Sequence, residues 1–223
     1  MNLDIENYFF LASHDLQEPN RIIISFLTNL EKKYKNNIDK QGQDYIKYAI
    51  DGAYYMRKSI LNLQEHSKIG KNINISKINL NNIVEDIIKE YKTALYKDNG
   101  NITIANLPTL ETDENLMHLI FKNLIENAIK FKKQGEKLQV TITFQEKKNH
   151  WEFACTDNGI GIDQEYHTKI FELFQRLNFK MENQGTGIGL PITKKAIERL
   201  GGKINVKSDE KKGSTFLFTL PKN

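Results

Sequence analysis

Hydrophobic side chains in residues 1–70 recur at alternating steps of four and three, which is the heptad rhythm of packed helices. The pattern predicts two helices, over residues 4–34 and 43–67, joined by a polar turn at 35–41. The recurring positions are Ile5, Phe9, Ala12, Leu16, Ile23, Phe26 and Leu30, with Pro19 filling the step between Leu16 and Ile23, then Ile46, Ala49, Ala53, Met56, Ile60 and Leu63. Because a lone hairpin buries only one narrow stripe, we expect a homodimer in which two hairpins form a four-helix bundle.

The pattern changes near residue 70, where a glycine lies among polar residues. We therefore expect a first domain at 1–70, a linker at 71–74 and a second domain at 75–223. Strands are predicted around 73–78 and at 102–105, 138–144, 151–156, 203–207 and 215–220. Helices are predicted at 80–96, at 113–132 with Thr112 as the cap, and at 191–200. This order favours a mixed sheet with helices on one face, an α+β sandwich.

Composition narrows the choice of function. A hydrophobic fraction of 39% and a charged fraction of 27% are typical of a soluble folded chain. The net charge of +4 comes from scattered lysines, so no nucleic-acid partner is expected. The single cysteine, Cys155, supports neither a disulfide framework nor a cysteine metal site. No apolar run is long enough to span a bilayer, and we expect a cytoplasmic protein or the cytoplasmic portion of a larger sensor protein.

The first candidate chemistry lies between Ser13 and Arg21. His14 falls on the heptad position farthest from the apolar stripe, so it is expected at the surface. Asp15 can accept a hydrogen bond from one ring nitrogen, which fixes the tautomer and makes the other nitrogen a better nucleophile. Pro19 removes an intrahelical hydrogen bond and should bend the helix just past the histidine. His14 taken alone favours an ordinary surface histidine, and its neighbours Asp15 and Pro19 make that interpretation less favoured.

Three polar residues share one face of the helix predicted at 113–132. Asn123, Asn127 and Lys130 are spaced i, i+4 and i+7. An amide oxygen is a hard ligand that suits Mg²⁺ shared with phosphate oxygens, and a lysine can pair with phosphate. A solvated polar face is the alternative interpretation of this segment.

A carboxylate followed by two glycines ends the strand predicted at 151–156. Gly159 and Gly161 allow the backbone to turn sharply and to approach a ligand closely. Asp157 could accept a hydrogen bond from the amino group of adenine. A plain turn is the alternative interpretation.

A second glycine loop precedes the helix predicted at 191–200. Gly185, Gly187 and Gly189 would present backbone amides at a helix N-terminus, which is an anion site. The loop is neither a Walker loop nor a dinucleotide fingerprint. Residues 171–177 are predicted to be an aromatic, amphipathic helix, followed by a short polar lid at 178–184.

Together these segments resemble a sensor histidine kinase of two-component signalling. SHDLQEPNR resembles the H box, NLIENAIKF at 123–131 the N box and DNGIGI at 157–162 the G1 box. FELFQRL at 171–177 resembles the F box, and GTGIGL at 185–190 the G2 box. The resemblance implies a dimerisation and histidine-phosphotransfer domain followed by a Bergerat-type ATP-binding domain. It also implies ATP and Mg²⁺ as ligands, and an autokinase that passes its phosphoryl group to a response regulator receiver domain.

The resemblance implies a role for each matching position. His14 would be the phosphoacceptor, Asp15 its base or orienting partner, and Asn127 the Mg²⁺ ligand. The other nucleotide-binding residues would be Asn123 and Lys130 near the phosphates, Asp157 on adenine, Gly159 and Gly161 around its pocket, Gly185, Gly187 and Gly189 at the phosphates, and Thr215 at the adenine end.

The sequence also departs from the family pattern. Glu18 stands where many members have Thr or Asn that positions a water molecule, so phosphatase activity of that type is not expected. Asn20 stands where an apolar residue is common, and Arg21 is a candidate contact for phosphate or the regulator. Two rival functions stay open: an ATPase without a phosphohistidine, and a docking module with a decayed nucleotide site. The signal, the regulator, and cis or trans transfer are not encoded in these residues.

Overall fold

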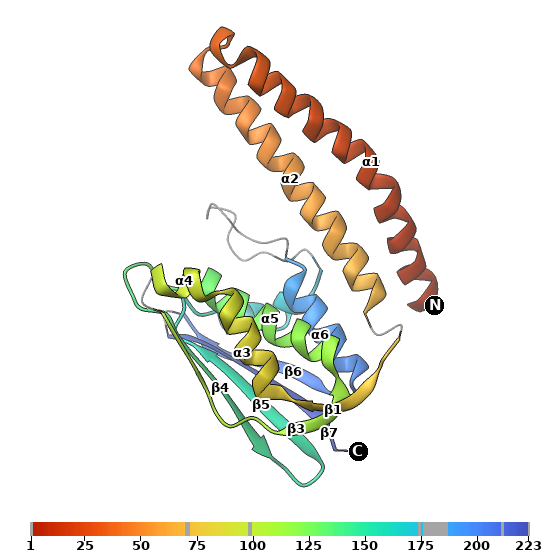
Figure 1. Ribbon diagram of the computed structural model, residues 1–223, viewed down its shortest axis with the longest axis vertical. Helices are drawn as coiled ribbons and strands as arrows, with labels where there is room; N and C mark the ends of the chain where they lie inside the picture. Colours follow the sequence, from red (N-terminus) through yellow and green to blue (C-terminus); the bar gives the residue numbers. More distant parts are fainter. Residues whose placement is uncertain are drawn as a thin grey trace. The chain divides into compact units, whose positions relative to one another are not determined.

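The computed structural model describes residues 2–69, 72–97, 100–173, 175, 187–210 and 212–222. The chain divides into two compact units, Met1–Lys68 and Ile69–Asn223 (Figure 1). Each unit is described by itself below.

The first unit is an antiparallel helical hairpin. Helix α1 spans Asn2–Tyr34, a 3-10 turn η1 spans Lys35–Asn37, and helix α2 spans Lys40–Lys68. The turn is closed by side chains: Asp39 accepts a hydrogen bond from the Gly42 amide at 2.8 Å. Gln43 donates to the carbonyl oxygens of Lys35 and Ile38 at 2.8 and 3.1 Å. The polar residues that predicted a turn therefore provide its hydrogen bonds.

The seam between the two helices differs from the predicted one. Within the described side chains of α1, the buried ones are Ser13, Asn20 and Ile24. The predicted seam residues of α1 whose side chains are described, Leu16, Ile23, Phe26 and Leu30, are exposed, for example Leu16 at 52% and Phe26 at 72%. Helix α2 buries Ala53 and Ile60, as predicted, and also Ser67. Helix α1 thus carries two neighbouring stripes with heptad spacing, and the more apolar one faces out of the hairpin.

Polar contacts hold the half of the hairpin that contains His14. Gln17 donates to Gln64 across the seam at 2.8 Å. Asn20 is 2% exposed, and its amide nitrogen donates to the Ala53 carbonyl at 3.1 Å. The Asn20 Oδ1 atom is buried and has no hydrogen-bond partner among the described residues. Burying an unpaired acceptor costs free energy, so this layer is less stable than an apolar one would be.

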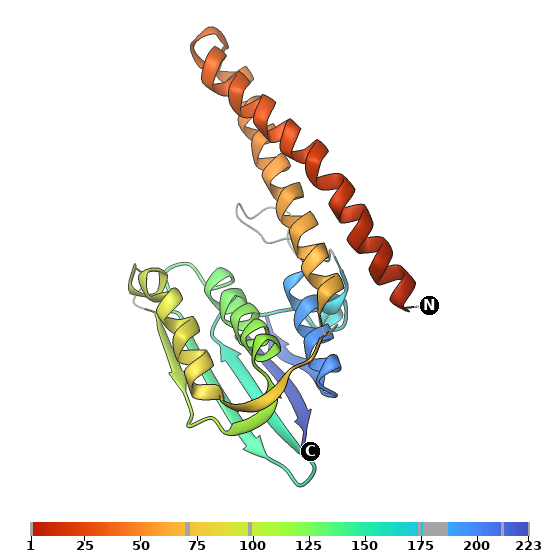
Figure 2. The same cartoon turned by 45° about the vertical axis from the view of Figure 1, so that its right-hand side comes forward.

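The second unit is a mixed sheet covered by helices on one face (Figures 1 and 2). The five-stranded sheet has the order β2-β4-β5-β7-β6, with β2 and β4 parallel and the other pairs antiparallel. A separate ribbon pairs β1 with β3. The strands are β1 Ile75–Asn79, β2 Asn101–Ile104, β3 Thr109–Asp113, β4 Gln139–Glu146, β5 His150–Asp157, β6 Lys203–Asp209 and β7 Gly213–Pro221. The helices are α3 Leu80–Glu90, α4 Lys92–Lys97, α5 Glu114–Lys130 and α6 Gly189–Arg199.

Aromatic rings form the centre of the core between α5 and the sheet. Phe153 of β5 stacks on Phe218 of β7, with ring centroids 4.9 Å apart. Phe121 of α5 packs edge-on against both rings, at 6.3 and 5.9 Å. All three side chains are fully buried, which fixes α5 over the middle of the sheet.

Several elements differ from the prediction. Strand β3 was not predicted, because its sequence TLETD lacks a run of β-branched residues. The helix expected at 80–96 is interrupted at Tyr91. The N-cap of α5 is Asp113 and not Thr112, because the Asp113 side chain accepts a hydrogen bond from the Leu116 amide at 2.9 Å. A helix was expected at 171–177, of which residues 171–173 and 175 are described. None of these is α-helical, and Phe171 is the last residue of the 3-10 turn η3, Lys169–Phe171. The 3-10 turn η2 spans Gln164–Tyr166.

Candidate functional site

His14 lies on the surface of α1, as its heptad position predicted. Its side chain is 74% exposed, and its Nδ1 atom lies 3.3 Å from Oδ1 of Asp15. When this ring nitrogen carries the proton, the Nε2 atom keeps its lone pair and faces solvent. The histidine is therefore accessible to a reactant, and Asp15 lies where it would favour the tautomer that has its proton on Nδ1.

One turn further along α1, two charged residues pair with each other. Arg21 donates to both carboxylate oxygens of Glu18, from Nε at 2.8 Å and from Nη2 at 2.6 Å. This hydrogen bonding is the main reason that the pKa of Glu18 is lowered from its usual value. Arg21 is thus already engaged within α1, which the sequence pattern did not reveal.

The predicted polar face of α5 meets the start of α6. Asn123 donates from Nδ2 to the Gly189 carbonyl at 3.3 Å. The Nδ2 atom of Asn127 is buried and has no hydrogen-bond partner within the part of the chain that the structure describes. Lys130 lies with its ammonium group 4.4 Å from the ring centroid of Phe131. An amide left unpartnered in a polar cluster is expected of a side chain whose partner is a ligand.

Asp157 lies at the end of β5 with its carboxylate partly buried. Its Oδ1 atom accepts hydrogen bonds from the amides of Gly159 at 2.8 Å and Ser214 at 3.3 Å. Burial raises the pKa of Asp157, and these two backbone bonds oppose that shift. Both bonds use one oxygen, so Oδ2 is available to accept a hydrogen bond from a ligand.

The loop after Asp157 packs between the end of α5 and the end of β6. The Ile160 amide donates to the Phe131 carbonyl at the end of α5 at 3.0 Å, and a Cβ on Gly159 would lie 2.6 Å from that oxygen. Gly161 has φ of +76°, and a Cβ there would lie 2.0 Å from the Asp209 carbonyl oxygen. Only glycine fits at both positions, so the two glycines are required by close packing.

Thr215 does not join this cluster. It pairs with Thr156 across β5 and β7, Oγ1 to Oγ1 at 3.1 Å, and successive side chains of a strand point to opposite faces. The residue opposite Asp157 in the register is Ser214, which the sequence reasoning missed. The strand alternation could have revealed it, because Asp157 and Phe153 are an even number of residues apart and share the helix-covered face.

The second glycine loop leads into the N-terminus of α6. Gly187 has φ of +70° and Gly189 is the first residue of the helix. No side chain caps the helix at Ile188, which leaves first-turn amides for an anion. Gly185, Phe174 and the predicted lid at 178–184 lie outside the described residues.

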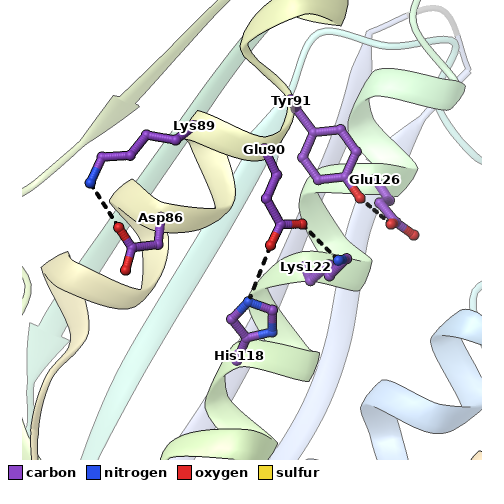
Figure 3. A network of polar contacts seen from close by, with 7 residues as sticks. All are labelled: Asp86, Lys89, Glu90, Tyr91, His118, Lys122 and Glu126. Atoms are coloured by element: carbon purple, nitrogen blue, oxygen red, sulfur yellow. Dashed lines mark hydrogen bonds and ion pairs between the residues drawn. The ribbon is translucent and has the colours of Figure 1, made fainter.

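A polar network that the sequence did not indicate links α3 to α5 (Figure 3). Tyr91, at the end of α3, donates from its hydroxyl to Glu126, the neighbour of Asn127. Glu90 pairs with Lys122 at 2.7 Å and lies 3.9 Å from the His118 ring. The pKa of Tyr91 is raised mainly by burial and, to a smaller extent, by the hydrogen bond to Glu126. These contacts fix the rotation of α5 and therefore the direction of its polar face.

No group of three His, Cys, Asp or Glu side chains that could hold a metal ion occurs among the described residues. The protein alone therefore does not form a metal cage in this part. The side-chain oxygen of Asn127 is the kind of ligand that fits a Mg²⁺ ion arriving with a polyphosphate, because Mg²⁺ is usually held by few protein oxygens together with phosphate oxygens and waters. The unpartnered Nδ2 atom is a donor and fits a phosphate oxygen instead.

Comparison with known proteins places this geometry in a family. Residues 112–223 match the family described as "Histidine kinase-, DNA gyrase B-, and HSP90-like ATPase", and the chain belongs to it. The phytochrome-like protein Cph1 of Synechocystis sp. is 33% identical over 222 residues, which is 99% of this chain. This chain spans 29% of the length of Cph1.

Solved structures show the same fold. Full-length ShkA, crystallised in complex with AMPPNP, covers 96% of this chain with a TM-score of 0.70 and 19% identity, and 45% of the ShkA chain is matched. The histidine kinase ThkA, crystallised in complex with the response regulator TrrA, matches 95% of this chain with a TM-score of 0.67 and 21% identity. The match includes 61% of the ThkA chain. In the described residues, every helix is too short or too polar to cross a membrane.

Proposed function

We propose that this chain is the kinase portion of a sensor histidine kinase. It transfers the γ-phosphoryl group of ATP to His14 and passes it to an aspartate of a response regulator. The observation that carries the proposal is the exposed His14–Asp15 pair on a helical hairpin, in the same chain as an ATPase-family domain. The similarity to Cph1 over both units supports it, and so do the AMPPNP bound to ShkA and the regulator bound to ThkA.

The nucleotide site is formed by the loops at the ends of α5, β5 and β7. The ionised Asp157 accepts a hydrogen bond from the adenine amino group through Oδ2. Gly159 and Gly161 shape the adenine pocket by letting the loop after Asp157 pack closely against Phe131 and Asp209. Ser214 supports the carboxylate through its amide, in the place that the sequence had assigned to Thr215.

The triphosphate extends along the polar face of α5 toward α6. Lys130 and Asn123 contact phosphate oxygens, and the amides at Gly187 and Gly189, with Gly185 in the same loop, receive the terminal phosphates. Asn127 would hold Mg²⁺ through its side-chain oxygen, and the bound ion would offset charge on the phosphate oxygens.

The transfer step is a displacement at the γ-phosphorus. Asp15 accepts a hydrogen bond from the Nδ1–H group, so the neutral ring keeps its proton there and the Nε2 lone pair attacks in line. The nitrogen–phosphorus bond forms as the bond to the ADP oxygen breaks, and ADP leaves with that electron pair. Asp15 stabilises the positive charge that develops on the ring. The protein contributes position and electrostatics.

We also propose that a second copy of the chain covers the outward apolar stripe. Leu16, Ile23 and Leu30 are exposed at heptad spacing on α1, and Tyr45 and Met56 are exposed on α2. His14 and Arg21 are also seven residues apart but lie on another flank, so a homodimer leaves the histidine accessible. A sensor domain upstream is consistent with the greater length of Cph1.

Incubation of the purified chain with γ-labelled ATP and Mg²⁺ tests the proposal. We expect acid-labile label on the protein that disappears in His14→Gln and persists in the control His150→Gln. An ATPase would release phosphate without labelling the protein, and a docking module would do neither. Either result would contradict the kinase function.

A further inference from the structure

The helix that carries His14 is acidic. Through residue 30, Arg21 is its only lysine or arginine, whereas Asp4, Glu6, Asp15 and Glu18 are acidic. The proposed function brings the polyphosphate of ATP to this helix and leaves a phosphoryl group that carries roughly −1.5 to −2 charges. A positive charge on this helix would lower the electrostatic repulsion between these anions.

Three of these residues follow one another along one exposed flank. His14, Glu18 and Arg21 are spaced i, i+4 and i+7, so Glu18 lies between the histidine and the arginine. The two hydrogen bonds from Arg21, at 2.8 and 2.6 Å, engage both oxygens of Glu18. Both side chains are exposed, and the pair is made within one helix. Glu18 is therefore an ionised carboxylate whose charge is neutralised on the side away from His14.

We propose that Arg21 is a positioning residue for phosphoryl transfer, whose guanidinium neutralises Glu18 and keeps its carboxylate turned away from the phosphoryl group on His14. This inference rests on the proposed function, because it takes His14 as the phosphoacceptor. Residues at i and i+4 have Cβ atoms only about 5–6 Å apart, so an unpaired Glu18 would repel the incoming phosphate. Arg21 starts about 10.5 Å from His14 along the axis, and it acts through Glu18.

The size of the effect follows from surface electrostatics. A like-charged pair at i and i+4 is a weak repulsion, and a phosphoryl dianion roughly doubles it. We therefore expect Arg21→Gln to slow the labelling of His14 about 2–5-fold at low salt. The defect should disappear near 0.5–1 M salt, where the screening length falls to roughly 3–4 Å.

The test measures the initial rate of acid-labile labelling of the whole chain at low and high salt. Four variants are compared with the wild type: Arg21→Gln, Arg21→Lys, Glu18→Gln and the double variant Glu18→Gln/Arg21→Gln. The matched control is Lys89→Gln, which breaks an exposed i, i+3 ion pair with Asp86 at 2.7 Å on α3. We expect wild-type rates for Arg21→Lys, Glu18→Gln, the double variant and the control. Melting temperatures show whether each variant is folded.

The double variant decides the proposal. If it is as slow as Arg21→Gln, then Arg21 does not act through Glu18 and the proposal is overturned. A defect that persists at high salt, or a wild-type rate for Arg21→Gln, also overturns it. Failure of the proposed function gives a different result, because label would then be missing from the wild type or would persist in His14→Gln.

Discussion

Gly161 offers a test of how closely the loop after Asp157 packs against the β6–β7 turn. In Gly161→Ala, the new Cβ would lie 2.0 Å from the Asp209 carbonyl oxygen and 2.9 Å from its carbon. Both atoms belong to the backbone, so they cannot rotate away. Gly135 provides a matched control, since its φ of +78° is close to the +76° of Gly161 and a Cβ there meets nothing within 4 Å.

Both substitutions place alanine in a left-handed backbone conformation, but only the one at Gly161 also causes a steric collision. A left-handed backbone at a residue other than glycine costs about 1–2 kcal/mol, which applies to both variants. The collision at Gly161 adds about 1–3 kcal/mol, because backbone must shift in a packed region. At about 2–4 °C per kcal/mol for a unit of this size, Gly161→Ala should melt roughly 2–12 °C below Gly135→Ala.

Thermal unfolding followed by circular dichroism measures this difference, and calorimetry measures ADP affinity. We expect Gly161→Ala to bind ADP at least about tenfold more weakly, since 1.4 kcal/mol spent on restoring the loop has that effect. Gly135→Ala should keep wild-type affinity. Equal melting temperatures and equal affinities for the two variants would refute the close packing of the loop on the β6–β7 turn.

Three further changes test other parts of the molecule. Asn20→Leu should raise the stability of the hairpin by about 1–3 kcal/mol, because it replaces a buried unpaired oxygen by apolar surface. Urea unfolding at fixed protein concentration measures this, and a lower free energy of unfolding for the variant would contradict the prediction. Tyr91→Phe should destabilise the second unit by about 1–2 kcal/mol, since the Glu126 carboxylate loses its donor, and unchanged melting would count against that bond. Burial raises the pKa of Asp157, so ADP affinity should fall as the pH drops through that raised value and the carboxylate is protonated. The same protonation removes the cost of burying the charge, so it favours the folded state. Calorimetry should show no pH-dependent fall in ADP affinity for Asp157→Asn.

Local patterns in the sequence predicted most of the helices and strands and the candidate site residues. The heptad rhythm predicted both long helices, since the period of a helix fixes which residues share a face. The exposure of His14 is confirmed, although the stripe from which it was predicted does not close the hairpin. The glycines at 159 and 161 signalled a tight backbone, and the cluster at Asn123 and Asn127 signalled a polar face on a buried helix. These inferences depend on residues close together in the chain.

Only the tertiary structure decided which of two adjacent heptad stripes closes the hairpin, because both stripes satisfy the same period and the choice depends on the partner helix. The pairing of Asp157 with Ser214, and of Thr156 with Thr215, depends on strand register, which is a relation between β5 and β7. The bond from Tyr91 to Glu126 joins residues 35 positions apart. Such contacts are fixed by the packing of whole elements on the core, and a local pattern carries no information about the neighbour that will be found there.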